Sequence, residues 1–273
     1  MTSTSKPPSR TQSPVTLAID IGGSGIKGIL LHETGEPISD RLRIATPQPS
    51  TPEAVLTGIM ELVKGLGHCD RVSVGFPGVI QHGRIKTAPN LDASWPGINL
   101  VEELKRLLHK PVRAANDADV QGFGAIKGKG VELVITLGTG FGTALFVNGA
   151  LVPNLEMGHH PFRKGKTYEE NLGASALKKI GKKKWTQRLE KAIATLDRVI
   201  NYDCLYLGGG NGKKVTRALP QNVTIISNVA GLLGGIALWT NSHTDKPSSA
   251  GRVKAKTATP SQKSSTTKRK PQE

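Results

Sequence analysis

Residues 17–31 read LAIDIGGSGIKGILL, in which two apolar runs flank a turn that holds a carboxylate, glycines, a hydroxyl and a lysine. The apolar runs predict adjacent strands over Thr16–Asp20 and Gly25–His32. Glycines let backbone N–H groups approach an anion without a Cβ in the way, and Ser24 and Lys27 add a hydroxyl donor and a positive charge. The stretch is therefore a candidate phosphate-binding turn, although a single glycine turn of this kind is more often an ordinary hairpin.

Asp20 ends the first of these strands and would repel a bare phosphate. A divalent cation between the carboxylate and the phosphate explains its presence, because Mg²⁺ is held by few carboxylates together with phosphate oxygens. We therefore expect Asp20 to hold Mg²⁺, directly or through water, and Gly22 and Gly23 to leave room for the phosphate.

Two further glycine turns follow apolar strands. Residues 133–152, LVITLGTGFGTALFVNGALV, predict two strands around a turn, and residues 204–210, CLYLGGG, predict a strand that runs into another. Neither a P-loop pattern nor a dinucleotide fingerprint between strand and helix fits these turns. Their repetition favours phosphate binding over a simple chain reversal. The candidate phosphate ligands in and after them are Gly138, Thr139, Gly140, Gly209 and Lys213.

Composition restricts the class of protein. The chain has 273 residues, enough for two modest domains, and its two cysteines are too few and too far apart for a disulfide framework or a zinc site. A reducing, cytoplasmic location fits this cysteine usage, and no apolar stretch reaches transmembrane length. The net charge of +16, half of it in residues 1–14 and 240–273, predicts an acidic partner such as nucleic acid, an anionic membrane or a phosphate compound, with a merely solvated basic surface as the alternative.

The order of predicted elements indicates an α/β fold. Composition predicts a disordered leader over residues 1–14 and a disordered basic tail over residues 240–273. Alternation predicts a third strand at residues 40–45, and apolar runs predict strands at residues 71–78, 111–119 and 224–228. Helical spacing predicts helices at residues 52–66, 100–108 and 229–239.

The stretch AANDAD ends one predicted strand with Asn116 and Asp117. A carboxylate there is suited to accept a hydroxyl proton, and the neighbouring amide is suited to bind a second hydroxyl. Asn and Asp are equally typical of the start of a helix, so the residues alone leave both interpretations open. Asp119 is the second-ranked candidate for the base.

Taken in order, the Asp-x-Gly-Gly-Ser turn, the Asn-Asp pair, the Gly-Thr-Gly-x-Gly turn and the Gly-Gly-Gly run resemble sugar kinases of the actin/Hsp70/hexokinase superfamily. Within it the chain resembles the ROK (repressor, open reading frame, kinase) family. The stretches DIGGSGIKG, TPQPSTP, TAPNLDASW, NDADVQG and VPNLEMGHH are most similar to its polyphosphate-using bacterial glucokinases. The resemblance covers about residues 15–239. It implies a two-domain ribonuclease H-like fold with a cleft, in which residues 15–115 form the smaller domain, residues 116–239 form the larger, and the last helix packs back on the first.

The resemblance also implies roles for individual residues. Asp117 becomes the catalytic base for the 6-hydroxyl of glucose, and Mg²⁺ becomes the cofactor. Glu169 and Glu170 both fit one sugar-binding position, of which Glu170 is preferred. ROK members with a zinc site carry a Cys-rich motif after the histidine, and none follows here, so no zinc is expected. The implied glucose-binding residues are Gly78, Asn90, Asn116, Asp117, Glu156, His159 and Glu170.

The lysine-rich stretch LKKIGKKKWTQRLEK, residues 177–191, bears on the phosphoryl donor. It is either a solvated helix face or part of a groove for a phosphate chain, to which Lys182 and Lys183 would contribute. Adenine prefers apolar walls, whereas a basic groove suits inorganic polyphosphate. We therefore expect polyphosphate and glucose as partners, with ATP as an alternative donor, and the family resemblance implies a homodimer.

Two alternatives remain open from the sequence. One is an ATP-dependent glucokinase or another ROK hexose kinase. The other is a nucleic-acid-binding regulator, since ROK relatives include repressors. About fourteen residues precede the first predicted strand, too few for a helix-turn-helix domain, so specific nucleic-acid binding is not expected.

Overall fold

The structure is a computed structural model, and it describes residues 13–226 and 234–240. These residues belong to one compact unit that ends at Ser242. Four predicted segments lie wholly or partly outside the described residues. They are most of the leader, the end of the strand 224–228, the first part of the helix 229–239 and nearly all of the tail. No helix among the described residues is long and apolar enough to cross a membrane.

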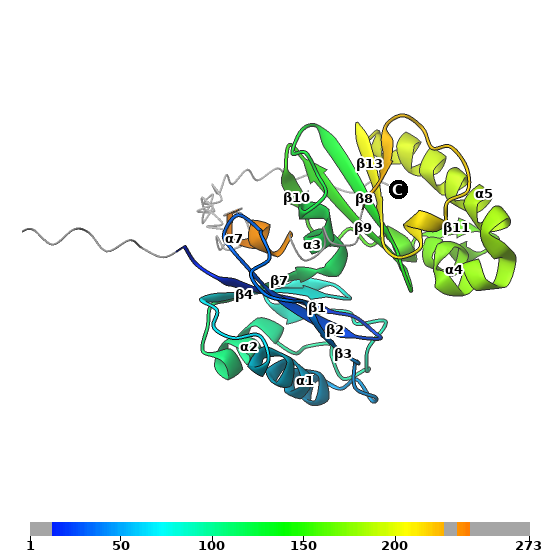
Figure 1. Cartoon of the computed structure of the whole chain (residues 1–273). Helices are drawn as coiled ribbons and strands as arrows, with labels where there is room; N and C mark the ends of the chain where they lie inside the picture. Colours follow the sequence, from blue (N-terminus) through cyan, green and yellow to red (C-terminus); the bar gives the residue numbers. More distant parts are fainter. Residues whose placement is uncertain (1–12, 227–233, 241–273) are drawn as a thin grey trace, which may run out of the picture. The chain divides into compact units, whose positions relative to one another are not determined.

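The first sheet has five strands in the order β3-β2-β1-β4-β7 (Figure 1). The first three strands form an antiparallel meander, and β4 and β7 run parallel to β1. The strands and the two helices that pack on this sheet are β1 (Thr16–Ile21), β2 (Ile26–Leu31), β3 (Leu42–Ile44), β4 (Arg71–Phe76), β7 (Val112–Asn116), α1 (Pro52–Lys64) and α2 (Leu100–Leu108).

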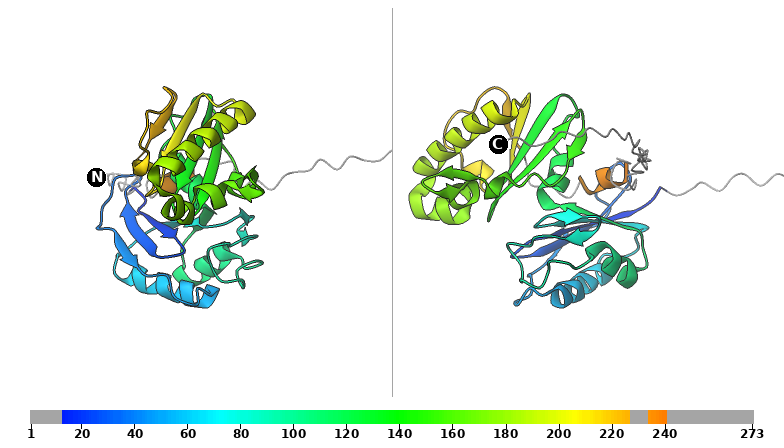
Figure 2. Two further views of the ribbon diagram at one scale, coloured as in Figure 1. Left: turned by 90° about the vertical axis from the view of Figure 1, so that its right-hand side faces the viewer. Right: turned by 180° about the vertical axis from the view of Figure 1, so that it is seen from behind.

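Apolar alternation explains how this sheet is covered. Helices α1 and α2 lie on the same face of the sheet (Figures 1 and 2). Leu17 and Ile19 of β1 pack there in one core cluster with Ile59 and Leu62 of α1. The helix α1 begins where the sequence predicts, because Thr51 Oγ1 accepts the backbone N–H of Ala54 at 3.3 Å.

The second sheet has five strands in the order β10-β9-β8-β13-β14, with its own core against α4 and α5. Strands β8, β9 and β10 are antiparallel, and β13 is parallel to β8 and β14. Gly181 interrupts α5 with φ 76° and ψ 160°, so this element consists of two helical segments. The strands of the second sheet and the helices that pack on it are β8 (Val131–Leu137), β9 (Phe141–Val147), β10 (Ala150–Val152), α4 (Tyr168–Leu172), α5 (Ala174–Ile200), β13 (Cys204–Gly208) and β14 (Val223–Ile225).

Short elements complete the described chain. Helix α3 follows β7 without a break and packs against β9 and the 3₁₀ turn η3. The short elements are β5 (Ile80–Gln81), β6 (Arg84–Ile85), α3 (Asp117–Phe123), η1 (Met157–His159), β11 (Pro161–Arg163), β12 (Lys166–Thr167), η2 (Gly212–Lys214), η3 (Gly234–Ile236) and α7 (Ala237–Thr240).

The end of the described chain packs on the first sheet. Ser73 Oγ of β4 donates to the carbonyl of Gly235 at 2.6 Å, and Trp239 Nε1 donates to Ser73 Oγ at 2.8 Å. The guanidinium groups of Arg71 and Arg113 lie over the Trp239 ring. These contacts hold η3 and α7 against strands that are distant in sequence.

Most predicted elements are confirmed, and three differ. The predicted strand 111–119 ends at Asn116, because Asn116 caps a helix there. Residues 133–152 form three strands rather than two, since Asn148 and Gly149 make a second turn with positive φ. The predicted helix 229–239 appears in its described part only as a 3₁₀ turn followed by the short helix α7.

Candidate functional site

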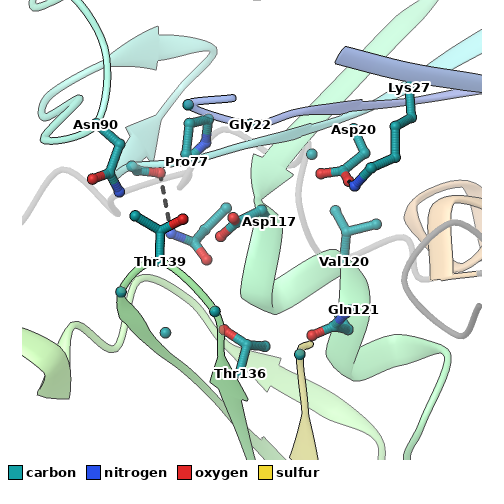
Figure 3. A pocket seen from close by; sticks show the side chains of 18 of the residues that line it. Asp20, Gly22, Lys27, Pro77, Asn90, Asp117, Val120, Gln121, Thr136 and Thr139 are labelled. Atoms are coloured by element: carbon teal, nitrogen blue, oxygen red, sulfur yellow. Dashed lines mark hydrogen bonds and ion pairs between the residues drawn. The ribbon is translucent and has the colours of Figure 1, made fainter. Parts of the chain in front are cut away.

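A pocket of about 720 Å³ is lined by residues of both sheets (Figure 3). All three glycine turns contribute to it, although they begin near residues 22, 138 and 208 of the chain. The structure thus brings motifs that the sequence treats separately to one place. The predicted site residues that line the pocket are Asp20, Gly22, Gly23, Ser24, Lys27, Gly78, Asn90, Asn116, Asp117, Gly138, Thr139, Gly140, Glu156, His159 and Gly209.

The first glycine turn carries a charged pair at its base. Lys27 Nζ lies 2.7 Å from Asp20 Oδ2, and the two residues are direct cross-strand partners on β1 and β2. Both side chains are about one-third exposed, and Figure 3 shows them side by side in the pocket. Gly22 N–H donates to the carbonyl of Gly25 at 3.0 Å, which closes the turn. The turn therefore presents a carboxylate, an ammonium group and backbone to the same space.

The second and third glycine turns contact each other. Asn211 Nδ2 donates to the carbonyl of Gly138 at 2.9 Å, and Gly138 N–H donates to the carbonyl of Gly140 at 3.2 Å. Gly209 has φ 80°, and a Cβ there would collide with the backbone of Leu137. Only glycine fits this position, so the end of β13 can lie directly against the end of β8.

Asp117 is the first residue of α3 and follows directly on the last residue of β7. Asn116 caps this helix, since its Oδ1 accepts the N–H of Ala118 at 2.8 Å. Burial, and next the nearby carboxylates of Asp20 and Glu156, raise the pKa of Asp117 to about 7. The helix-cap interpretation is thus correct for Asn116, while Asp117 presents to the pocket a carboxyl group that exchanges a proton near neutral pH.

Asn116 and Glu156 form a polar wall beside Asp117. Asn116 Nδ2 donates to Glu156 Oε1 at 3.0 Å and to the carbonyl of Gly78 at 3.2 Å. His159 Nε2 lies 3.5 Å from Glu156 Oε2. Burial raises the pKa of Glu156, and His159 opposes this shift. This wall offers hydrogen-bond donors and acceptors that suit a polyhydroxylated ligand.

The structure corrects the preference for Glu170 as a sugar-site residue. Glu170 Oε2 accepts the N–H of Thr167 at 2.9 Å, and Thr167 Oγ1 accepts the N–H of Glu170 at 3.2 Å, so this carboxylate closes a capping box at the start of α4. Glu169 lines the pocket instead, and its Oε2 accepts the N–H of Phe141 at 3.2 Å. Of these two neighbouring glutamates, Glu169 is therefore the one that lines the pocket.

Asp119, the second-ranked candidate base, does not line the pocket. It is 2% exposed, and burial raises its pKa to about 8. Its Oδ2 accepts the N–H of Asn154 at 3.5 Å, while its Oδ1 has no hydrogen-bond partner in the described part of the chain. A buried group without access to the pocket is not placed to take a proton from a ligand there.

The predicted lysines of the phosphate site also lie elsewhere. Lys182 and Lys183 are exposed on α5 just after Gly181, and Lys213 is exposed on η2. None of the three lines the pocket. Lys182 and Lys183 lie on the outer face of a helix that packs on the second sheet through Trp185 and Leu189. The pocket contains other polar residues that the sequence did not single out, among them Arg41, Arg43, Gln121 and Thr136.

The donor atoms near the first turn bear on the expected Mg²⁺. Among the described residues, no three His, Cys, Asp or Glu side chains come together as a metal cluster. Asp20 alone presents a carboxylate at this turn. Such a donor set fits Mg²⁺ that is held mainly by phosphate oxygens and water.

Two curated relatives match most of the chain in sequence. The polyphosphate glucokinase of Mycobacterium tuberculosis (strain CDC 1551 / Oshkosh) is 37% identical to this chain, and the match covers 85% of this chain and 93% of the relative. That of Mycobacterium leprae is 34% identical, over 84% of this chain and 76% of its own length.

Solved structures share the fold. The inorganic polyphosphate/ATP-glucomannokinase of Arthrobacter sp. strain KM matches with a TM-score of 0.75 and 32% identity, over 83% of this chain and 99% of that one. A ROK family glucokinase from Streptomyces griseus, in complex with glucose and AMPPNP, matches with a TM-score of 0.71 and 20% identity, over 82% and 98% of the two chains. The model of the ROK family itself matches residues 16–169. With its α/β fold, its three convergent glycine turns and these matches, the chain belongs to the ROK family.

Proposed function

We propose that this chain is a phosphotransferase that moves the terminal phosphoryl group of inorganic polyphosphate to the 6-hydroxyl of glucose, giving glucose 6-phosphate. One observation carries the proposal: Asp117 lines a single pocket together with the polar wall of Asn116 and Glu156 and with all three glycine turns. A proton acceptor between sugar-type and phosphate-type groups is the arrangement that phosphoryl transfer to a hydroxyl requires. Relatives above 30% identity that carry polyphosphate in their names support the choice of donor.

The acceptor side of the pocket binds and orients the sugar. The amides of Asn90 and Asn116 and the carboxylates of Glu156 and Glu169 offer both donors and acceptors to hydroxyl groups, and His159 completes the set. Orientation of this kind brings the attacking oxygen into line with the phosphorus atom.

Asp117 accepts the proton of the 6-hydroxyl as the oxygen of that hydroxyl attacks the terminal phosphorus. The bond between this phosphorus and the bridging oxygen breaks, and the shortened polyphosphate leaves with the electron pair. A pKa of about 7 places the carboxylate near the optimum for a base that works at neutral pH.

The donor side of the pocket binds phosphate. Ser24, Thr139 and the glycine turns offer hydroxyl groups and backbone, and Lys27 offers a positive charge. Asp20 would hold Mg²⁺, directly or through water, and the ion supplies charge neutralisation to the donor phosphates when bound. No zinc takes part in this scheme. We also expect a cytoplasmic homodimer, with domains over residues 15–115 and 116–239.

The donor is tested with purified protein, glucose, Mg²⁺ and either polyphosphate or ATP, with glucose 6-phosphate measured by a coupled dehydrogenase. We expect product from polyphosphate, and a lower rate or none from ATP. Product from ATP alone would contradict the choice of donor and favour an ATP-dependent ROK hexose kinase. Product from neither donor would contradict the transferase proposal, and a mobility-shift assay with DNA at physiological salt would then test a regulator.

A further inference from the structure

We propose that Arg41 and Arg43 form a subsite for the phosphates behind the transferred group, so that a linear polyphosphate lies across the pocket face of the first sheet rather than along the lysines of α5. This inference rests on the proposed function, and it specifies where the donor of that function binds.

The strand register places these charges in a row. Asp20 on β1 pairs with Lys27 on β2, and Lys27 pairs with Arg43 on β3, so the three side chains share one face of the sheet. Arg41 precedes Arg43 by two residues, which is the spacing of one face of an extended strand. All four residues line the pocket. A row of cations thus begins at the proposed Mg²⁺ residue and ends at the edge of the sheet.

The guanidinium of Arg43 is held against the first glycine turn. Its Nη2 donates to the carbonyl of Ser24 at 3.0 Å. A Cβ on Gly25 would lie 2.6 Å from the same nitrogen, so the absence of a side chain there makes room for the guanidinium. An arginine has five N–H donors, and this contact uses one of them. The others are available to an anion bound at the turn.

The arginine charges lack carboxylate partners. Lys27 is paired with Asp20, but across residues 13–226 and 234–240 neither Arg41 nor Arg43 has an ion pair with an acidic residue. Lys27 and Arg43 are also directly opposite each other, and like charges in that position destabilise a sheet. A bound polyanion removes this repulsion, which couples the arginines to the donor.

No other lysine or arginine of the described chain lines the pocket besides Lys27, Arg41 and Arg43. All three belong to β2 and the β3 edge of the first sheet. Arginine binds phosphate oxygens in bidentate fashion and suits a donor that presents phosphate after phosphate. In the transfer step, the group that leaves is the polyphosphate shortened by one unit, and its new terminal oxygen carries the negative charge that this row neutralises.

The test compares two double variants that each remove two positive charges. Arg41→Gln/Arg43→Gln removes the proposed subsite, and Lys182→Gln/Lys183→Gln removes an exposed pair on α5 as the matched control. We expect the arginine variant to raise the KM for long-chain polyphosphate about tenfold and to change the KM for glucose less than twofold. In this variant the plot of log KM for polyphosphate against log salt concentration should also become shallower by about 1.5, because two fewer positive charges release counterions. The lysine variant should match the wild type in all three.

The inference would be overturned if the lysine variant raised the KM for polyphosphate and the arginine variant did not. Arg43→Lys keeps the positive charge but loses the bidentate guanidinium, so its affinity for polyphosphate should lie between those of the double variant and the wild type. An effect of net charge alone predicts the wild-type affinity instead. Thermal melting confirms that each variant is folded.

Binding of polyphosphate, measured by titration calorimetry, separates this inference from the proposed function. If wild-type protein binds polyphosphate and the arginine variant does not, the subsite stands even without transfer to glucose, and only the proposed reaction fails. If transfer occurs and the arginine variant binds as the wild type does, the reaction stands and the subsite is wrong.

Discussion

Asn116 Nδ2 lies 3.0 Å from Glu156 Oε1, and this hydrogen bond joins the end of β7 in the first sheet to the segment that follows β10 of the second. The same amide also donates to the carbonyl of Gly78, so one side chain ties three segments of the pocket together. Because Asn116 also caps α3 through Oδ1, this one residue contributes both to the position of Asp117 and to the polar wall beside it.

Asn116→Ala is therefore expected to impair both stability and sugar binding. Loss of the cap should lower the free energy of unfolding by about 1 kcal/mol, and loss of the bond to Glu156 should raise the KM for glucose. The matched control is Asn99→Ala, which removes the cap of α2, where Asn99 Oδ1 accepts the N–H of Glu102 at 3.2 Å. The control should cost similar stability and leave the KM for glucose unchanged. Equal effects of both variants on this KM would refute a specific role for Asn116.

The neighbouring glutamates provide a second matched pair. Glu169→Gln should raise the KM for glucose, because Glu169 lines the pocket. Glu170→Gln should leave that KM unchanged and lower the melting temperature slightly, because Glu170 only closes the capping box of α4. Steady-state kinetics with varied glucose distinguish them. The opposite ranking would restore the sequence-based preference for Glu170.

The pH dependence of the reaction should report Asp117. Burial, with Asp20 and Glu156, raises the pKa of this carboxyl group to about 7, and only its ionised form accepts a proton. We therefore expect kcat/KM for glucose to rise with pH through a midpoint near 7 and then to level off. A midpoint near 4, the ordinary value for aspartate, would contradict this account of the base.

Asp119 should make the protein less stable at alkaline pH. Burial raises its pKa to about 8, above the ordinary value of about 3.9 in an unfolded chain, so the folded state binds the proton more tightly. The stability that this proton contributes is complete below about pH 4 and is lost as the pH rises through 8. Asp119→Asn cannot ionise, so its free energy of unfolding should vary less between pH 6 and 9 than that of the wild type.

Urea denaturation at several pH values measures this difference. The control is Asp197→Asn, which alters an exposed aspartate of α5 and should keep the wild-type slope over the same range. If the free energy of unfolding of Asp119→Asn changed with pH as steeply as that of the wild type, Asp119 would not be protonated in the folded state at neutral pH.

The position of the three glycine turns at the ends of apolar strands was predictable from the sequence, because carboxylates, glycines and hydroxyls follow those strands in a recognisable order. The choice between Glu169 and Glu170 was not. Consecutive residues on a helix point about 100° apart, so the choice depends on where α4 begins, and the Thr167 cap decides that. The sequence contains the cap, but it does not show which side of the helix faces the pocket.

The basic residues of the pocket show the same limit. The alternation in residues 40–45 predicts that Arg41 and Arg43 share a face, but only the register of β3 against β2 reveals that this face is the pocket. The lysines of α5 are more numerous and attract attention in the sequence. Their exclusion from the pocket depends on how Trp185 and Leu189 orient that helix in the core.

The most direct test of the central claim is the formation of glucose 6-phosphate from polyphosphate and glucose by wild-type and Asp117→Asn protein, followed by ³¹P NMR. Calorimetry on the same two proteins measures glucose binding. The account predicts that the wild type forms product, and that Asp117→Asn loses about 10²- to 10⁴-fold in kcat while it binds glucose with an affinity close to that of the wild type. Near-normal turnover by Asp117→Asn, or no product from the wild type, would contradict it.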